Sequence, residues 1–380
     1  MSYSFHKSVF LFIIFCACIC LSLQNSMKIS LKEALIINSS DIGKVNEVQI
    51  DGSGQIYISD GINQCIHLYS SKGKFIRKIG RKGKGPGEYQ YIWGIKITKG
   101  DSLVVYDGIQ YRITIYAPGK YDSPTKTIKI PINENQHDSP GVIGNRYTGN
   151  SGLWLPKNNS KEFLIIYNTP YSSNDLIQKH YSNLYRIDNK GTFIQKKPSL
   201  KVEYEEKLII SSEGSGFMIT DMPFGRKPII VLNKNGIINY AETDDFNITA
   251  IDLNGKKKNK ISHKIDKVFI SNKLWQDELK NYSDLGLKDI EKSKLPLPKH
   301  LPIFDDFTID DEDNIWVAVN EKDYRSYKYH VFNKKGKLIS MIPIHDKTVI
   351  KIINKGFAYG IKTDDLGIQS IVKYKVEKTK

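Results

Sequence analysis

The sequence gathers cationic and aromatic side chains between residues 81 and 93. The cations come first and the aromatic residues follow: Arg81, Lys82, Lys84, Tyr89, Tyr91 and Trp93. Ammonium and guanidinium groups attract anions, and aromatic rings stack on sugars and bases. The segment is therefore a candidate site for an anionic or sugar ligand. The alternative is that the aromatic residues belong to the core and the cations to a solvated loop.

The same segment is rich in glycine, which invites comparison with a phosphate-binding loop. A P-loop ends in Gly-Lys-Ser or Gly-Lys-Thr, whereas here Gly85 precedes Pro86. The spacing excludes a phosphate cradle of that kind. We predict a link between structural repeats instead.

Two histidines occupy matching places in the sequence. His67 and His330 each stand six residues before a glycine, at Gly73 and Gly336. If first and last repeats were neighbours, the two side chains could share a metal. A catalytic zinc usually has three protein ligands, and no carboxylate joins these histidines by spacing. We therefore predict ordinary strand positions and no metal site.

The aspartates favour structural roles. Asp60, Asp107 and Asp221 each follow an apolar run, where a short carboxylate accepts backbone amides of the next turn. The acidic stretch at residues 305–313 lacks the glycine and the distal glutamate of a calcium loop. Neither a Gly-x-Ser-x-Gly nor a His-Glu-x-x-His motif occurs, so two common hydrolase signatures are absent.

The composition is that of a folded globular protein. The 380 residues are 40% hydrophobic and 26% charged, with a formal net charge of +15. This charge favours acidic partners such as nucleic acid, anionic glycans or a phospholipid surface. The lysines are spread along the chain rather than massed in one arm, so a solvated basic surface is the simpler interpretation.

The N-terminus has the layout of an export signal. Lys7 precedes an apolar run over residues 9–23, and polar residues follow at once. We predict a signal peptide over residues 1–26, with one domain over residues 27–380. Cys18 lies in a loose lipobox and is the candidate for lipidation. If cleavage instead removes the whole run, Cys65 alone remains and no intrachain disulfide is expected.

From residue 46 onward the pattern is one of short apolar strands separated by Gly, Asn and Asp. An acidic turn that leads into a strand occurs at residues 51–58 and again at 310–317. Residues 217–221 and 103–107 resemble the strand that ends in aspartate at Asp60. The chain is therefore predicted to be all-β and built from repeats.

Glycines that close tight hairpins give the number of repeats. Six are expected to adopt positive φ, which favours glycine: Gly73, Gly119, Gly191, Gly236, Gly255 and Gly336. They predict a β-propeller with about six blades of four antiparallel strands. N- and C-terminal strands should pair in one blade and close the ring. A partly helical insertion is expected near residues 272–300.

Several of these segments resemble a known repeat family. Residues 56–60, Asn63, 66–69, 73–76 and the phrase at 83–89 are similar to the NHL repeat and to six-bladed propellers exported by Bacteroidetes-type bacteria. The match is strong over residues 46–120, returns at 303–343 and is faint between them. The resemblance implies a propeller, commonly a lipoprotein or secreted protein, and supplies no active site.

These observations favour a binding or scaffold protein of the cell envelope. It would be periplasmic or outer-membrane-associated and would recognise a protein, peptide or carbohydrate through one propeller face. The first alternative is a metal-dependent hydrolase or lyase with calcium or zinc in the central funnel; otherwise no cofactor is expected. The second is binding of nucleic acid or another anionic polymer, and the export signal argues against nucleic acid.

Overall fold

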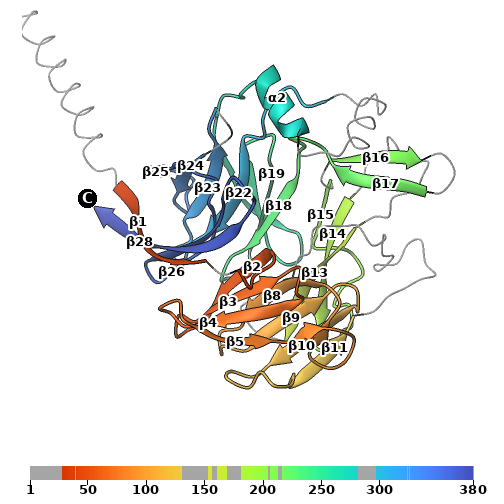
Figure 1. Cartoon of the computed structure of the whole chain (residues 1–380). Helices are drawn as coiled ribbons and strands as arrows, with labels where there is room; N and C mark the ends of the chain where they lie inside the picture. Colours follow the sequence, from red (N-terminus) through yellow and green to blue (C-terminus); the bar gives the residue numbers. More distant parts are fainter. Residues whose placement is uncertain are drawn as a thin grey trace, which may run out of the picture.

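A computed structural model describes residues 28–38, 40–130, 153–155, 161–168, 181–203, 206–212, 216–280, 297–322, 324 and 326–379. Within them the chain forms six four-stranded antiparallel sheets set around a central channel (Figure 1). This architecture is a six-bladed β-propeller. It confirms the predicted fold class, the number of blades and the four strands in each.

The first three blades are formed by consecutive strands. Blade 1 contains β2 (Val45–Ile50), β3 (Ile56–Asp60), β4 (Cys65–Tyr69) and β5 (Phe75–Ile79). Blade 2 contains β8 (Ile92–Ile97), β9 (Leu103–Asp107), β10 (Arg112–Tyr116) and β11 (Lys126–Lys129). Blade 3 contains β12 (Leu153–Trp154), β13 (Glu162–Asn168), β14 (Tyr181–Asp188) and β15 (Leu200–Glu203). A short parallel pair, β6 (Arg81–Lys82) and β7 (Glu88–Tyr89), lies in the link between blades 1 and 2.

Blades 4 and 5 follow the same plan. Blade 4 contains β18 (Pro228–Leu232), β19 (Ile238–Glu242), β20 (Asn247–Ile251) and β21 (Lys257–Ser262). Blade 5 contains β22 (Phe304–Ile309), β23 (Ile315–Asn320), β24 (Tyr327–Phe332) and β25 (Leu338–Ile344). The hairpin β16 (Lys207–Ser212) and β17 (Gly216–Asp221) precedes blade 4, and the helix α2 (Asn272–Leu279) follows it. No helix in the described part of the chain has the length and apolar character needed to span a membrane.

Blade 6 joins the two ends of the described chain. It contains β26 (Val349–Asn354), β27 (Phe357–Thr363), β28 (Gln369–Thr379) and, as its outer strand, β1 (Lys28–Ile37). Strands β1 and β28 are antiparallel and lie side by side (Figure 1). The predicted closure of the ring by N- and C-terminal strands is confirmed.

The middle strands of the blades are buried on both sides. In β9, Val104 and Tyr106 pack against blade 3, whereas Leu103 and Val105 pack against blade 1. Successive side chains of a strand point to opposite faces of the sheet, so one strand contributes to two cores. Six apolar clusters result, one in each interface between neighbouring blades. This explains why the strands read as continuous apolar runs.

The chain reverses at every turn of a blade, so its connections alternate between two faces of the ring. Turns between the second and third strands, and the links between blades, lie on what we call the link face. The other turns lie on what we call the opposite face. All six predicted glycines adopt positive φ. Five of them close the turn between third and fourth strands in blades 1–5, but Gly236 lies between the first two strands of blade 4.

Aspartates organise the turns of the opposite face. Asp51 and Asp310 each accept two backbone amides of their own turn through Oδ1. Their Oδ2 atoms accept a hydrogen bond from the aromatic residue six positions later, the Tyr57 hydroxyl at 3.1 Å and the Trp316 indole N–H at 3.0 Å. The two copies of the acidic turn found in the sequence are therefore structurally equivalent.

Polar contacts on the opposite face also connect successive blades. Lys234 of blade 4 donates to the Asp311 carbonyl of blade 5. The Asp311 carboxylate accepts the amide of Lys355 in blade 6 at 3.0 Å, and Lys355 Nζ donates to the Gly52 carbonyl of blade 1 at 2.8 Å. The Gly52 amide donates to Asp101 of blade 2 at 2.7 Å. These contacts fix the blades relative to one another.

On the link face, Asp60 and Asp107 perform the predicted capping role. Each accepts four backbone N–H groups, two from the link before its blade and two from the turn that follows it. Each also accepts a side-chain amide, from Asn63 at 2.8 Å and from Gln110 at 2.7 Å. Asp221 differs because β17 belongs to no blade. It is exposed and ion-paired with Lys207 across the hairpin.

The lysines occupy the rim of the ring. Five of the six outer strands, namely β1, β5, β11, β15 and β21, carry at least one lysine, and β25 carries none. Charged residues on the free edge of a sheet oppose edge-to-edge association. The positive charge of the chain is thus spread around its circumference.

The capping role predicts unequal effects of two aspartate substitutions. Asp107→Ala removes the acceptor of five hydrogen bonds at a fully buried position. Asp364→Ala removes two amide contacts at an exposed turn. We expect Asp107→Ala to lower the free energy of unfolding, measured in urea, by about 3 kcal/mol or more. We expect Asp364→Ala to lower it by about 1 kcal/mol. Equal losses would contradict this account of the link face.

Candidate functional site

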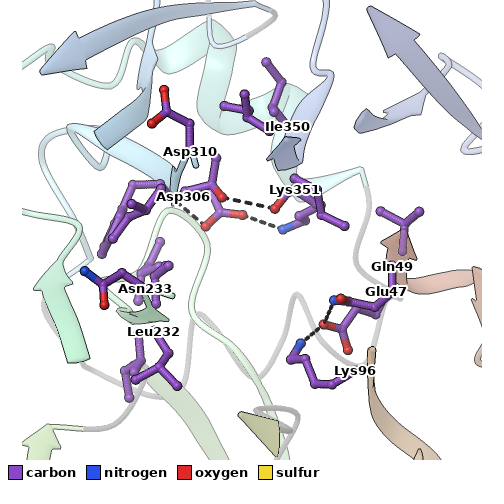
Figure 2. Close-up of a pocket in the computed structure, with 18 of the residues that line it drawn as sticks. Glu47, Gln49, Lys96, Leu232, Asn233, Asp306, Asp310, Ile350 and Lys351 are labelled. Atoms are coloured by element: carbon purple, nitrogen blue, oxygen red, sulfur yellow. Dashed lines mark hydrogen bonds and ion pairs between the residues drawn. The ribbon is translucent and has the colours of Figure 1, made fainter. Parts of the chain in front are cut away.

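The inner strands of the six blades surround a central channel of about 720 Å³. Its lining comes from every blade, including β2, β8, β18, β22 and β26 (Figure 2). Inner strands have no neighbouring strand on their channel side, so their polar groups face this space. A volume of this size accommodates a small polar ligand or part of a chain.

Two ion pairs between neighbouring inner strands neutralise charge inside the channel. Lys96 of β8 contacts Glu47 of β2, and Lys351 of β26 contacts Asp306 of β22 (Figure 2). Glu47 also accepts the side-chain amide of Gln49 at 2.9 Å. Each pair joins two blades, so the same contacts hold the ring together and reduce the charge presented to a ligand.

A β-bulge occurs in the inner strand of four blades. The extra residues are Asn46, Trp93, Asp305 and Lys351, and all four line the channel. A bulge redirects a side chain and commonly lies beside a functional site. These inner strands begin at the link face, so the bulges place polar and aromatic groups near the channel mouth on that face.

Asp305 is the most enclosed carboxylate at this mouth. It accepts hydrogen bonds from the Tyr327 hydroxyl at 2.7 Å and the Asn320 amide at 2.8 Å, and Lys347 lies 3.4 Å away. The Lys347 ammonium also lies 3.6 Å from the centre of the Tyr324 ring. Burial raises the pKa of Asp305. The charges of Lys347 and Lys227 lower it by more than burial raises it, so the net shift of the pKa is downward.

The channel offers little for hydrolytic chemistry. No histidine occurs in the described part of its lining, and Glu47, Asp305 and Asp306 each have a lysine partner. A metal-dependent hydrolase needs ligands that converge on one point and remain available to the ion. In the described lining, these three carboxylates are already engaged by cations.

The two predicted histidines do not meet. His67 lies in blade 1 beside Asp60, whereas His330 lies in blade 5 with its ring 6.1 Å from that of His263. Burial and the neighbouring His263 lower the pKa of His330 to about 4. Blade 6 separates the two histidines because β26, β27 and β28 form a further blade with β1. A metal shared between them is therefore ruled out.

The cations of the predicted ligand segment lie on the link between blades 1 and 2. Arg81 is ion-paired with Glu88 at 2.7 Å. Lys82 and Lys84 are exposed, and the backbone amide of Lys84 donates to Glu88 at 3.1 Å. Glu88 thus fixes the glycine-rich loop, and the lysine side chains point into solvent.

The aromatic residues of the segment divide between core and surface. Tyr89 is fully buried, and its hydroxyl lies 2.8 Å from those of Thr114 and Tyr116, so an external ligand does not reach it. Tyr91 is 38% exposed, and its ring packs edge to face on Trp93 at 6.3 Å. Trp93 lines the channel. The structure therefore brings Tyr91 and Trp93 together at the channel mouth and leaves Tyr89 in the core.

Exposed aliphatic residues on the link face were not singled out from the sequence. Turn residues of three consecutive blades carry large apolar side chains with high exposure: Leu366 (85%) and Ile368 (55%) in blade 6, Ile62 (62%) in blade 1 and Ile109 (51%) in blade 2. Tyr91 lies beside the blade 2 turn, where its carbonyl accepts the Gly108 amide at 3.0 Å. We call Ile62, Tyr91, Ile109, Leu366 and Ile368 the apolar arc.

The blades that carry the apolar arc are joined at this face. Gln369 of blade 6 accepts the amide of Val45 in blade 1 at 2.8 Å, and Gln64 of blade 1 accepts the amide of Ile92 in blade 2 at 2.7 Å. The turns that carry the arc therefore belong to three blades that are joined at this face. Part of the arc could have been found in the sequence. Ile62 and Ile109 each stand two residues after an aspartate that ends a strand, at a turn position that is usually polar.

Comparisons with known proteins agree with this fold. A family model described as a 6-bladed beta-propeller (DUF5128) matches residues 37–212. A candidate exported protein from Bacteroides fragilis is similar over 93% of this chain and 96% of its own, with 12% identity and a TM-score of 0.52. A DUF4221 family member from Bacteroides vulgatus is similar over 93% and 99%, with 10% identity and a TM-score of 0.54. No curated protein sequence matches.

These findings confirm the resemblance to six-bladed propellers that was inferred from the sequence. At 10–12% identity the structural likeness shows the fold alone.

The environment of Asp305 predicts a pH-dependent effect of removing its cation. A carboxylate whose folded pKa lies below the unfolded value of about 3.9 contributes stability above that pH and loses it as the pH falls through the folded value. We expect Lys347→Met to lower the free energy of unfolding by about 1–3 kcal/mol at pH 7. The difference from wild type should shrink towards pH 3, where Asp305 becomes protonated in the variant. Urea unfolding at both pH values measures this.

The matched control is Lys99→Met, which changes an exposed lysine on the opposite face. Its effect should be small at both pH values. A loss in Lys347→Met that does not change with pH would show that ring packing, rather than the charge of Asp305, explains the effect.

Proposed function

We propose that this six-bladed β-propeller is an exported binding protein that recognises a protein or peptide partner through the apolar arc of its link face. The observation that carries the proposal is the exposure of Ile62, Ile109 and Leu366 at turn tips of three consecutive blades. Large contiguous apolar patches are uncommon on monomeric proteins and mark interaction sites.

The side chains of the arc indicate which class of partner is favoured among proteins or peptides, glycans and nucleic acids. Four of its five residues are aliphatic. Isoleucine and leucine offer neither an aromatic face nor hydrogen bonds to a sugar ring, whereas they pack well against apolar side chains. A protein or peptide with an apolar contact surface is therefore favoured over a glycan. Nucleic acid is disfavoured because the lysines of the outer strands are distributed around the rim.

The other half of the link face supports the same conclusion. There the chain covers its own aromatic turn residues: Phe224 packs on Tyr324 and on Trp275 of α2, each with ring centroids 5.2 Å apart. The helix α2 thus covers Phe224 in the link before blade 4, and Phe224 in turn covers Tyr324 at the turn tip of blade 5. Among the described residues no comparable element covers the arc on blades 6, 1 and 2, which leaves it available to a partner.

Export rests on the N-terminal pattern. The basic residue Lys7, the apolar run over residues 9–23 and the polar residues after it are typical of a signal peptide. Residues 1–27, with Cys18, lie outside the described part of the chain. The propeller would then act in the cell envelope, and lipidation at Cys18 would hold it at a membrane surface.

Partner binding is tested by removing the arc. In the triple variant Ile62→Ser, Ile109→Ser, Leu366→Ser we expect loss of a partner that wild-type protein retains from envelope extracts, with binding weakened more than about tenfold. The substituted side chains are exposed, so thermal stability should change little. Quantitative mass spectrometry of the retained proteins is the measurement.

The matched control is the double variant Phe75→Ser, Ile76→Ser. These residues are 45% and 46% exposed but lie on β5, the outer strand of blade 1, away from the link face. The control should retain the same partner as wild type. If both variants lose it equally, general hydrophobicity explains the capture, and the arc is not the binding surface.

Export and lipidation have a separate test. We expect the full-length chain, expressed in a Gram-negative bacterium, to be found in the envelope fraction without its N-terminal segment. If Cys18 is the acylated residue, intact-mass measurement will show a lipid that Cys18→Ser lacks. Retention of unprocessed chain in the cytoplasm would contradict the predicted signal.

A further inference from the structure

Blade 1 contains a buried set of three possible metal ligands away from the channel. Asp60 ends β3, and Cys65 and His67 lie on β4 opposite it. All three side chains are buried, and their potential ligand atoms lie within 4.8 Å of one another. His67 Nε2 is 3.2 Å from Asp60 Oδ2 and 3.6 Å from Cys65 Sγ.

Comparison with blade 2 shows that this set departs from the local repeat. Asp107 matches Asp60, and the residue opposite it in the strand register is Arg112, where blade 1 has Cys65. Two residues further on, blade 2 has Thr114 where blade 1 has His67. Blade 1 therefore lacks a permanent cation opposite its buried aspartate and has two soft metal-ligating side chains at those positions.

We infer that Asp60, Cys65 and His67 form a binding site for a zinc-like divalent transition metal within blade 1. Zinc binds nitrogen and oxygen ligands at about 2.0–2.2 Å and sulfur at about 2.3 Å, in tetrahedral geometry. In that geometry a nitrogen and an oxygen ligand lie about 3.4 Å apart, and a sulfur and a nitrogen ligand about 3.6 Å apart. The observed nitrogen–oxygen separation of 3.2 Å is about 0.2 Å shorter than the first value, and the observed sulfur–nitrogen separation of 3.6 Å equals the second. The fourth position would take a water molecule, because Asp60 Oδ1 already accepts three backbone amides.

The charges of the site balance when the metal is bound. One carboxylate and one thiolate neutralise a divalent cation, which suits a position closed to solvent. Without a cation, burial and the Asp60 charge raise the pKa of Cys65 to about 11, so the thiol keeps its proton. Binding transfers that proton to solvent. Ligation through His67 Nε2 would require the proton of the neutral imidazole to be on Nδ1, which has no hydrogen-bond partner among the described residues.

Asp60 is suited to remain anionic in this position. Burial raises its pKa, but hydrogen bonds from Asn63, Gly43 and Ile62 lower it to about 2. The same hydrogen bonds fix the orientation of the carboxylate, as partners of metal ligands commonly do. The site would tie β3 to β4 beside the link face, and its role would be structural.

The test is a titration of the mature chain, residues 27–380, with Co²⁺ under reducing, oxygen-free conditions. We expect one ion per chain and a thiolate-to-cobalt absorption in the near ultraviolet, which Zn²⁺ abolishes by displacement. Cys65→Ser should lose this absorption, and His67→Gln should bind more than about tenfold more weakly. The control His330→Gln, which changes the matching histidine of blade 5, should titrate like wild type.

A second measurement avoids variants that fail to fold. Cys65 is the only cysteine of residues 27–380, so the rate of thiol alkylation in mild denaturant reports on it alone. Zn²⁺ should slow this reaction more than about tenfold, and Mg²⁺, which prefers oxygen ligands, should not. Absence of a thiolate band together with unchanged alkylation in Zn²⁺ would overturn the proposal.

Discussion

Burial of the middle strands on both sides is the constraint on which the rest of this structure depends. A blade alone would expose the apolar side chains of both its faces, because Val104 and Tyr106 face one neighbour while Leu103 and Val105 face the other. Each core exists only between two blades, so a stable structure requires a closed ring. The pairing of β1 with β28 provides this closure, and it links the first described strand to the last.

This constraint also decides where polar groups lie. The core between blades leaves only the two faces, the channel and the outer rim for charge. Buried aspartates on the link face accept backbone amides that would otherwise lack partners, and aspartates on the opposite face do the same for the acidic turns. Lysines occur on five of the six outer strands, and Lys96 and Lys351 in the channel pair with carboxylates of a neighbouring blade.

The candidate sites follow from departures from the repeat. Bulges redirect Trp93 and Asp305 into the channel, and aliphatic residues replace polar ones at the tips of three turns. In blade 1, Cys65 stands where blade 2 has Arg112. A regular blade needs none of these changes for its stability. The binding surface and the proposed metal site adjoin, because the Ile62 amide donates to Asp60. The arc side chains are exposed and the three proposed ligands are buried, so a partner and an ion would contact different atoms.

The sequence by itself determined the all-β class and the equivalence of Asp51 with Asp310, because these depend on local turn chemistry and strand periodicity. It also predicted the ring closure, because a ring of blades has to pair the free edges of its terminal strands. Tertiary structure decided which similar segments are equivalent: Gly236 closes a different turn from the other glycines, and Asp221 lies outside any blade. It also separated buried Tyr89 from exposed Tyr91, and it brought Ile62, Ile109 and Leu366 onto one face. The exposure of each of these side chains depends on how neighbouring blades pack, and the residues that pack together are far apart in the sequence.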